Sequence, residues 1–309
     1  MTTFKYSGDG IEQLIASYKK DRHPFTVQDN LIFPDVEPLI LELKHTLFPR
    51  YHNQGEDLNP SRPAAVQEQL EKLTVLLVEG IKASWQISAS ENPEDKISEP
   101  KIDEQTHNAV GSLLDGLAAI REILKLDIEA ALKGDPAANG AAEIITTYPA
   151  FTAILTYRVA HLLYHQGVPY LPRRLTEYSH SKTGIDIHPG AKIGDSFFID
   201  HGTGVVIGET AEIGKNVRMY QGTVLGAWLL SVKNIDKLRE SKRKRHPTVE
   251  DNVVIYSNAS IVGGRTRIGK NSLIGGNVTL ANQKIKENSI VINHHTTKIE
   301  KLEYPEELL

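Results

Sequence analysis

The chain has 309 residues, of which 40% are hydrophobic and 24% charged, a balance typical of a folded globular protein. Its net charge of −4 gives no general attraction to nucleic acid or to an anionic membrane surface. The absence of cysteine excludes disulfides, thiolate metal ligands and a cysteine nucleophile. Neither a signal peptide nor an apolar run near the roughly 20 residues of a membrane-spanning helix is visible. We therefore expect a cytoplasmic protein without nucleic-acid or membrane partners.

Helical periodicity dominates residues 1–183, which we predict to form an all-helical domain. Residues 88–101 are polar and contain prolines, and we expect them to form a surface loop. Asp135 follows a glycine and precedes a proline, a combination that ends a helix. The predicted helices are Ile11–Lys20, Val36–Leu47, Pro63–Trp85, Asp103–Leu132, Tyr148–Gln166 and Leu171–Ser179.

His161 and His165 are four residues apart on a predicted helix, which is a spacing used by metal ligands. The intervening residues contain no glutamate of the kind found in zinc-protease helices. Packing or surface polarity is the favoured interpretation of this pair.

A six-residue period replaces the helical pattern after Gly184. Such a period is typical of hexapeptide β-helix repeats, in which each aliphatic residue points into a narrow prism. A β-sandwich is the rival fold, but its strands would show simple alternation. We predict a β-helix over residues 184–292. Its inward positions are Ile187, Ile193, Ile199, Ile207, Ile213, Met219, Leu225, Val249, Ile255, Ile261, Ile268, Ile274 and Leu280.

Apart from a one-residue insertion around Gly263 and Gly264, two larger irregularities interrupt this period. The step from Ile199 to Ile207 is two residues too long, and it contains Asp200 and His201. Residues 226–246 are too long and too charged to be a turn, so we expect an external loop. Its basic end is either solvated or contacts an anionic ligand such as a nucleotide phosphate. The tail, residues 293–309, is expected to run along the surface or to be disordered.

Three segments carry a resemblance to a known family: DIHPGAKIG from Asp186, IDHGTGVVIGETAEIG from Ile199, and RHP from Arg245. Together they resemble the serine O-acetyltransferases of bacteria and plants, over roughly residues 133–291. The resemblance implies an α+β protein, in which an N-terminal helical domain precedes a left-handed parallel β-helix. It also implies acetyl transfer from acetyl-CoA to L-serine, giving O-acetyl-L-serine for cysteine synthesis. Such enzymes assemble as trimers or as dimers of trimers.

The same resemblance assigns roles to individual residues. His201 matches the family's general base and Asp186 the carboxylate that orients it. The residues that match the surroundings of the serine are Asp135, Asp200, Arg245 and His246.

The chemistry of these side chains agrees with those roles. A serine hydroxyl needs a base that is unprotonated near neutral pH, and a carboxylate can fix the tautomer of that base. Arg245 can bind the substrate carboxylate in a fork, and Asp135 can bind the ammonium group. His246 can polarise the thioester or stabilise the oxyanion. No metal is required, and direct transfer is the simplest mechanism.

Two segments depart from the family pattern. Gly226 and Ala227 stand where a glycine-rich turn approaches the pantetheine arm of acetyl-CoA, but Trp228 follows them. Family members that bind O-acetylserine sulfhydrylase end in isoleucine, whereas this chain ends in Leu309. Binding of that enzyme through the tail is therefore a hypothesis.

Three alternatives remain open from the sequence. The acceptor in place of serine is homoserine, a sugar or another hydroxyl compound. A metal-dependent β-helix hydratase would use His188, His201 and His246 as zinc ligands. A non-catalytic scaffold would only bind the sulfhydrylase.

Overall fold

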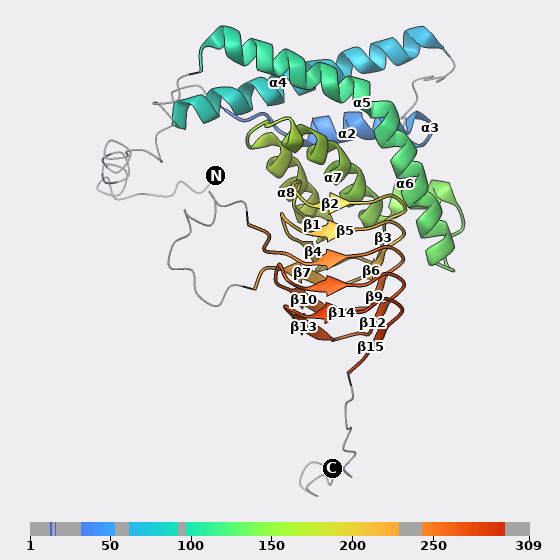
Figure 1. Cartoon of the computed structure of the whole chain (residues 1–309). Coiled ribbons are helices and arrows are strands. Elements are labelled where there is room, and N and C mark those ends of the chain that lie inside the picture. Colours follow the sequence, from blue (N-terminus) through green and yellow to red (C-terminus); the bar gives the residue numbers. More distant parts are fainter. Residues whose placement is uncertain are drawn as a thin grey trace, which may run out of the picture.

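In the part of the chain that the structure describes, seven helices precede fifteen short strands (Figure 1). The structure is a computed structural model, and it describes residues 32–52, 62–91, 97–228 and 243–293, with Gln13 and Ala16. The helices lie at one end of the molecule and the strands stack below them (Figure 1). The predicted helix Ile11–Lys20 lies outside the described residues except for Gln13 and Ala16.

The helical part is built around two long antiparallel helices, α4 and α5, that lie across the top of Figure 1. Leucines buried between the two helices join them, with Leu73 of α4 and Leu113 of α5 fully buried. Helices α7 and α8 lie between this pair and the strands (Figure 1). The bounds are α2 Glu37–Leu47, α3 Pro49–His52, α4 Pro63–Glu91, α5 Glu99–Gly134, α6 Ala141–Thr147, α7 Pro149–His165 and α8 Leu171–Thr183.

The predicted loop 88–101 is too long at both ends. Helix α4 continues to Glu91, and α5 already begins at Glu99. Pro100 stands at the start of α5, where a proline is tolerated because the first helical N–H groups have no intrahelical partner. The proline therefore marks a helix start rather than a loop.

The strands form three parallel sheets of five strands each. Sheet A has the order β1-β4-β7-β10-β13, sheet B β14-β11-β8-β5-β2, and sheet C β15-β12-β9-β6-β3. Three successive strands make one coil, and the coils stack into a left-handed parallel β-helix, which confirms the predicted α+β fold. The bounds are β1 Asp186–Ile187, β2 Lys192–Ile193, β3 Phe198–Asp200, β4 Val206–Ile207, β5 Glu212–Ile213, β6 Arg218–Tyr220, β7 Val224–Gly226, β8 Thr248–Val249, β9 Val254–Ile255, β10 Ser260–Val262, β11 Arg267–Ile268, β12 Leu273–Ile274, β13 Thr279–Ala281, β14 Lys284–Ile285 and β15 Ile290–Val291.

The predicted inward residues stack on one another in register. In sheet A, Ile187 pairs with Ile207, and Ile207 with Leu225. All of the predicted inward residues except Ile193, which is half-buried, are at most 5% exposed. The six-residue period is therefore confirmed as the core of the β-helix.

The over-long step in this period becomes an enlarged corner. Residues 201–205 join β3 to β4, whereas only residues 221–223 join β6 to β7 one coil below. The two extra residues cannot enter the stacked strands, so they enlarge the corner between sheets C and A.

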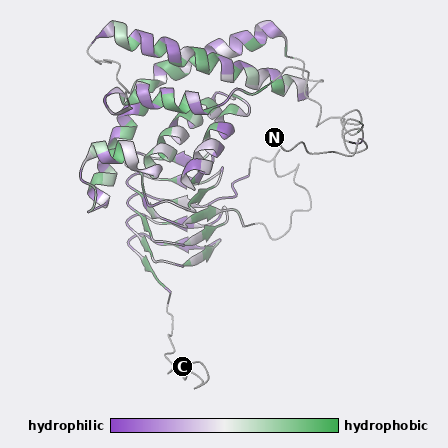
Figure 2. Ribbon diagram, turned by 180° about the vertical axis from the view of Figure 1, so that it is seen from behind, coloured by the Kyte–Doolittle hydropathy of each residue, from purple (hydrophilic) through white to green (hydrophobic). Residues whose placement is uncertain are grey.

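Hydropathy varies along each long helix, with hydrophobic and hydrophilic residues intermixed (Figure 2). This pattern is expected of helices that bury one face. None of the described helices combines the length and apolar character needed to cross a membrane.

A buried ion pair joins the helical part to the first coil. Arg158 on α7 donates from Nε and Nη2 to the carboxylate of Asp127 on α5, at 2.7 and 2.8 Å. The same guanidinium donates to the carbonyls of Ile193 and Gly194, and Asp127 accepts the N–H of Phe197 at 2.9 Å. Arg158 is only 7% exposed and Asp127 only 3%. This bidentate pair therefore fixes α5, α7 and the first coil relative to one another.

Replacing Arg158 with methionine should lower the free energy of unfolding by about 3–5 kcal/mol, because it leaves the Asp127 carboxylate buried without its partner. Denaturant unfolding measures the loss. Lys125→Met is the matched control, since Lys125 forms an exposed pair with Glu122, and it should cost at most about 1 kcal/mol. Equal losses in the two variants would contradict a structural role for the buried pair.

Candidate active site at the corners of the first coil

His201 and Asp200 occupy the corner where the first coil turns from sheet C into sheet A. The His201 side chain is 72% exposed, and its Nδ1 lies 3.8 Å from Oδ1 of Asp200. His201 has a positive φ of 57°. Seven of the ten non-glycine residues with positive φ in the described chain are asparagines, which tolerate this region well. A histidine in this conformation, exposed and without a core contact, indicates a functional position.

Asp135 lies beside this corner, at the C-terminal end of α5. Its carboxylate accepts the Ala137 N–H at 2.8 Å and the Tyr148 hydroxyl at 2.6 Å. The Tyr148 hydrogen bond lowers the pKa of Asp135, and the charge of His201 adds to the decrease. The same bond raises the pKa of Tyr148 to about 12, with a contribution from Asp200. These interactions join four polar side chains into one cluster, which the sequence predicted except for Tyr148.

The end of α5 is held against the coil by close packing. Arg218 on β6 donates from Nη1 to the Gly134 carbonyl at 3.1 Å. A Cβ on Gly134 would lie 2.7 Å from the ring of Phe198, so only glycine allows this approach. The contact places Asp135 next to the corner that contains His201.

Arg245 lies at a different corner, where the connection from β7 to β8 passes from sheet A to sheet B. Its Nη2 donates to Oε2 of Glu209 in the β4–β5 turn. Tyr164 on α7 donates to the other oxygen of that carboxylate at 2.9 Å. Glu209 therefore holds the guanidinium of Arg245 and is itself anchored by the helical part.

His246 packs beside Arg245 and is 9% exposed. Burial and the charges of Arg245, His188 and Lys244 together lower the pKa of its imidazole to about 4, against an opposing effect of Glu209. His246 is therefore neutral near neutral pH.

Asp186 does not contact His201 in this structure. Its carboxylate pairs with Nη1 of Arg173 on α8 at 3.2 Å. Among the described residues, no hydrogen bond or ion pair joins Asp186 to His201, and Asp200 is the carboxylate nearest to that imidazole. The side chain of Asp186 points out of sheet A, where α8 supplies the arginine.

The site residues thus fall into two groups within one protomer. The β3–β4 turn contributes His201 and lies beside Asp135, whereas the β4–β5 turn holds Arg245 and His246. These two turns lie at opposite ends of strand β4, so sheet A separates the groups.

Gly226 and Ala227 lie at the end of β7, at the start of the external loop. The Gly226 carbonyl accepts the N–H of Gly263 at 3.0 Å, which holds the strand end in the coil. Trp228, which is 45% exposed, is the last described residue before residue 243. Most of the predicted external loop therefore lies outside the described residues.

The three histidines of the hydratase hypothesis are not brought together in one protomer. His201 lies at one corner and His246 at another, and Nδ1 of His188 accepts the N–H of Gly190. Within the described ranges, no group of three metal-binding side chains includes them.

The described residues do bring Glu177, His180 and Asp186 within reach of a common ion. Arg173 pairs with both carboxylates of this group, so its guanidinium already offsets part of their negative charge. His161 has a different explanation: its Nδ1 donates to the Pro189 carbonyl at 2.7 Å, which makes it a packing contact between α7 and the coil.

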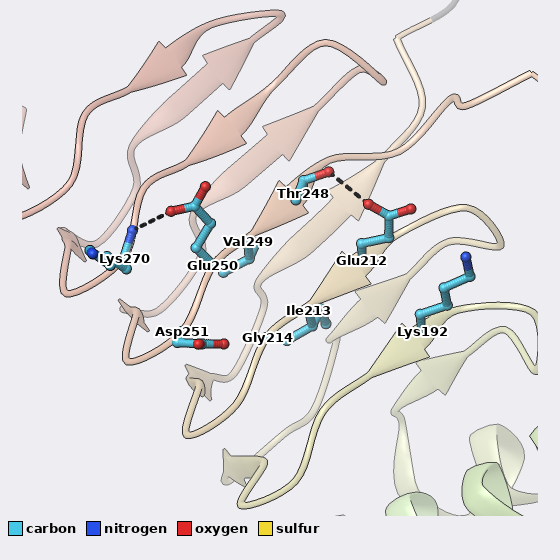
Figure 3. Close-up of a pocket in the computed structure, with 9 residues that line it drawn as sticks. All are labelled: Lys192, Glu212, Ile213, Gly214, Thr248, Val249, Glu250, Asp251 and Lys270. Carbon is cyan, nitrogen blue, oxygen red and sulfur yellow. Dashed lines mark hydrogen bonds between the residues drawn. The ribbon is translucent and has the colours of Figure 1, made fainter.

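A hollow of about 410 Å³ lies on the outer face of sheet B (Figure 3). Two of its carboxylates are already hydrogen-bonded: the Thr248 hydroxyl donates to Glu212 at 3.3 Å, and the Lys270 backbone N–H donates to Glu250 at 2.9 Å. None of the predicted site residues lines it. The lining residues are Lys192, Glu212, Ile213, Gly214, Thr248, Val249, Glu250, Asp251 and Lys270.

A helical part followed by a left-handed β-helix, with histidines and carboxylates at the coil corners, defines a hexapeptide-repeat acyltransferase. No family model matches the sequence. The chain is 42% identical to the plasmid serine acetyltransferase of Synechococcus elongatus over 238 residues, which cover 77% of this chain and 74% of the relative. It is 44% identical over 160 residues to a serine acetyltransferase of Bacillus licheniformis, covering 52% and 69% of the two chains.

Solved structures with a similar fold are also serine acetyltransferases. Serine acetyltransferase isoform 3 of Entamoeba histolytica, solved in complex with cysteine, superposes with a TM-score of 0.72 at 35% identity. The match covers 94% of this chain and 93% of that one. The chain belongs to the serine acetyltransferase family.

Replacing Tyr148 with phenylalanine should raise the pKa of Asp135 toward its ordinary value, because the strongest hydrogen bond to the carboxylate is lost. A carbon-detected NMR titration of the aspartate side chains measures this change. Tyr256→Phe, directly after β9, is the control and should leave Asp135 unaffected. An unchanged pKa in Tyr148→Phe would contradict the cluster.

Proposed function

We propose that this protein transfers the acetyl group of acetyl-CoA to the hydroxyl of L-serine, giving O-acetyl-L-serine and free CoA. The observation that carries the proposal is the enlarged corner of the first coil. It exposes the His201 imidazole beside Asp200, with Asp135 electrostatically coupled to it. A base close to two carboxylates suits a substrate that has both a hydroxyl and an ammonium group.

His201 acts as the general base in this proposal. It takes the proton of the serine hydroxyl as the oxygen attacks the thioester carbonyl, and the imidazolium then protonates the departing CoA thiolate. The C–O bond of the ester forms and the C–S bond of the thioester breaks. Asp200 lies closest to the imidazolium, and its charge stabilises that intermediate state. Asp186 can orient His201 only if its carboxylate leaves Arg173 and binds the imidazole instead.

The substrate is recognised by complementary charges. Asp135 and Asp200 bind the serine ammonium group, and the fork of Arg245 binds its carboxylate. Glu209 occupies one nitrogen of Arg245, and the remaining donors of the guanidinium are sufficient for a substrate carboxylate.

The complete site forms between neighbouring subunits of a homotrimer. Sheet A separates His201 from Arg245 and His246 in one protomer, so the two groups meet only if the corner of one coil faces the opposite corner of the next. Rotational symmetry would then produce three equivalent sites. A dimer of trimers through the helical parts is compatible with this arrangement.

Gly226 and Ala227 lie where the chain approaches the donor, and we propose that acetyl-CoA passes them. The protein is proposed to act in the cytoplasm. Its tail beyond Asn293 lies outside the described residues, and binding of O-acetylserine sulfhydrylase through Leu309 remains a hypothesis.

Replacing His201 with alanine should lower kcat by about 10²–10⁴-fold, the usual contribution of a general base. The measurement is thiol release from acetyl-CoA in the presence of L-serine. His107→Ala is the matched control, because His107 is exposed on α5, and it should retain wild-type turnover.

A panel of acceptors tests the substrate in the same assay. L-Serine should be preferred over L-homoserine and over sugars, which lack the paired charges that Arg245 and Asp135 recognise. Turnover of a sugar without turnover of L-serine would refute the proposed function. Unchanged serine acetylation in His201→Ala would refute the role of the base.

A further inference from the structure

The His246 side chain packs against the segment Gly208-Glu209-Thr210. A Cβ on Gly208 would lie 2.0 Å from both Cδ2 and Nε2 of His246. The face of the ring therefore packs over Gly208 at its Cδ2–Nε2 bond, in a space that exists only because this residue lacks a side chain. Residue 208 directly follows the inward-facing Ile207, so the ring lies on the outside of the coil.

Thr210 holds the opposite edge of the same ring. The Thr210 N–H donates to Nδ1 of His246 at 3.1 Å, and the Thr210 hydroxyl lies 2.9 Å from the same nitrogen. The hydroxyl oxygen also accepts the backbone N–H groups of Arg245 and His246, at 2.8 and 3.0 Å. One threonine thus makes four contacts with these two residues.

These contacts determine which ring nitrogen carries the proton. A backbone N–H can only donate, so Nδ1 of His246 must accept and therefore has a free lone pair. In the neutral ring, the proton then resides on Nε2. A proton on Nδ1 would face the N–H of Thr210, placing two donors against each other in a buried site.

The neutral state has support from the surrounding charges. Arg245 and Lys244 from the same segment and His188 from the β1–β2 turn disfavour the imidazolium, as does burial, and only Glu209 favours it. His246 therefore enters the reaction as a neutral side chain with a single N–H.

We propose that Thr210 is a positioning residue that fixes His246 as a neutral Nε2–H donor aimed at the carbonyl oxygen of the acetyl thioester. The inference rests on the proposed acetyl transfer. In that reaction the Nε2–H hydrogen bond stabilises the oxyanion that forms when the serine oxygen attacks. The serine proton goes to His201, so His246 neither gains nor loses a proton.

The tautomer itself is the most direct test, and it does not require activity. With selectively ¹⁵N-labelled histidine, the Nδ1 resonance of His246 should be that of an unprotonated ring nitrogen and Nε2 that of a protonated one, near neutral pH. The His246→Gln variant assigns the signals, since only those of His246 disappear. A protonated Nδ1 would overturn the inference.

Substitutions of His246 distinguish a donor from a base. Glutamine has a side-chain N–H but cannot accept a proton near neutral pH, whereas alanine has neither property. We expect His246→Ala to lower kcat by about 10²-fold, as for an oxyanion donor, and His246→Gln to lower it by only about 10-fold. Equal losses in the two variants would contradict the donor role.

Substitutions of Thr210 test the positioning role. Thr210→Val removes the hydroxyl at nearly constant volume and should lower kcat by about 10-fold, whereas Thr210→Ser should recover most of that loss. In a His246→Ala background, Thr210→Val should lower kcat clearly less than it does in the wild type, because the contacts of Thr210 with the ring are already missing. A full additional loss in that background would show that Thr210 has a merely structural role.

The two proposals fail in different ways. If L-serine is not acetylated but the tautomer is as expected, the proposed function is wrong and the assignment of the ring proton stands. If L-serine is acetylated but Nδ1 is protonated, the proposed function stands and the role given to Thr210 is wrong.

Discussion

The stacking of parallel coils is the constraint on which the rest of this structure depends. Each inward aliphatic residue must lie directly above its counterpart in the next coil, as Ile187, Ile207 and Leu225 do in sheet A. Extra residues cannot be absorbed within the strands, so they are placed at the corners. The two additional residues between β3 and β4 expose His201 in this way, and the insertion between β7 and β8 brings Arg245 and His246 to another corner.

The helical part supplies Asp135, a site residue that the narrow coil does not contain. The buried Asp127–Arg158 pair fixes α5 and α7 against the first coil. Further along α5, the contact between Arg218 and the Gly134 carbonyl sets the position of Asp135 beside His201. A loosening of this junction would move Asp135 away from the histidine without altering any strand of the coil. Stability and substrate recognition are therefore linked through one helix.

The period of the sequence predicted the coil because an inward residue every six positions has few other structural explanations. The over-long step from Ile199 located the His201 corner for the same reason. By contrast, the contacts of Tyr148 with Asp135 depend on how α5 and α6 meet, which spacing alone does not determine. The pairing of Asp186 with Arg173 likewise arises because α8 packs over sheet A.

The position of the proton on the His246 ring could be inferred only from the three-dimensional structure. The sequence places Thr210 and His246 far apart in the chain, with the external loop between them. Only the fold shows a backbone N–H donating to Nδ1, and this bond converts a histidine of unspecified role into a donor. The fold thus shows that the segment from Gly208 to Thr210 packs against the His246 ring and accounts for its orientation.

The central claim is that His201 of one subunit and His246 of its neighbour serve the same active site. Co-expression of His201→Ala and His246→Ala subunits, followed by purification of mixed trimers, tests it most directly. Random mixing should restore about a quarter of the wild-type turnover of L-serine and acetyl-CoA, because some interfaces then combine an intact His201 with an intact His246. Mixed trimers no more active than the two parent variants would contradict a site shared between subunits.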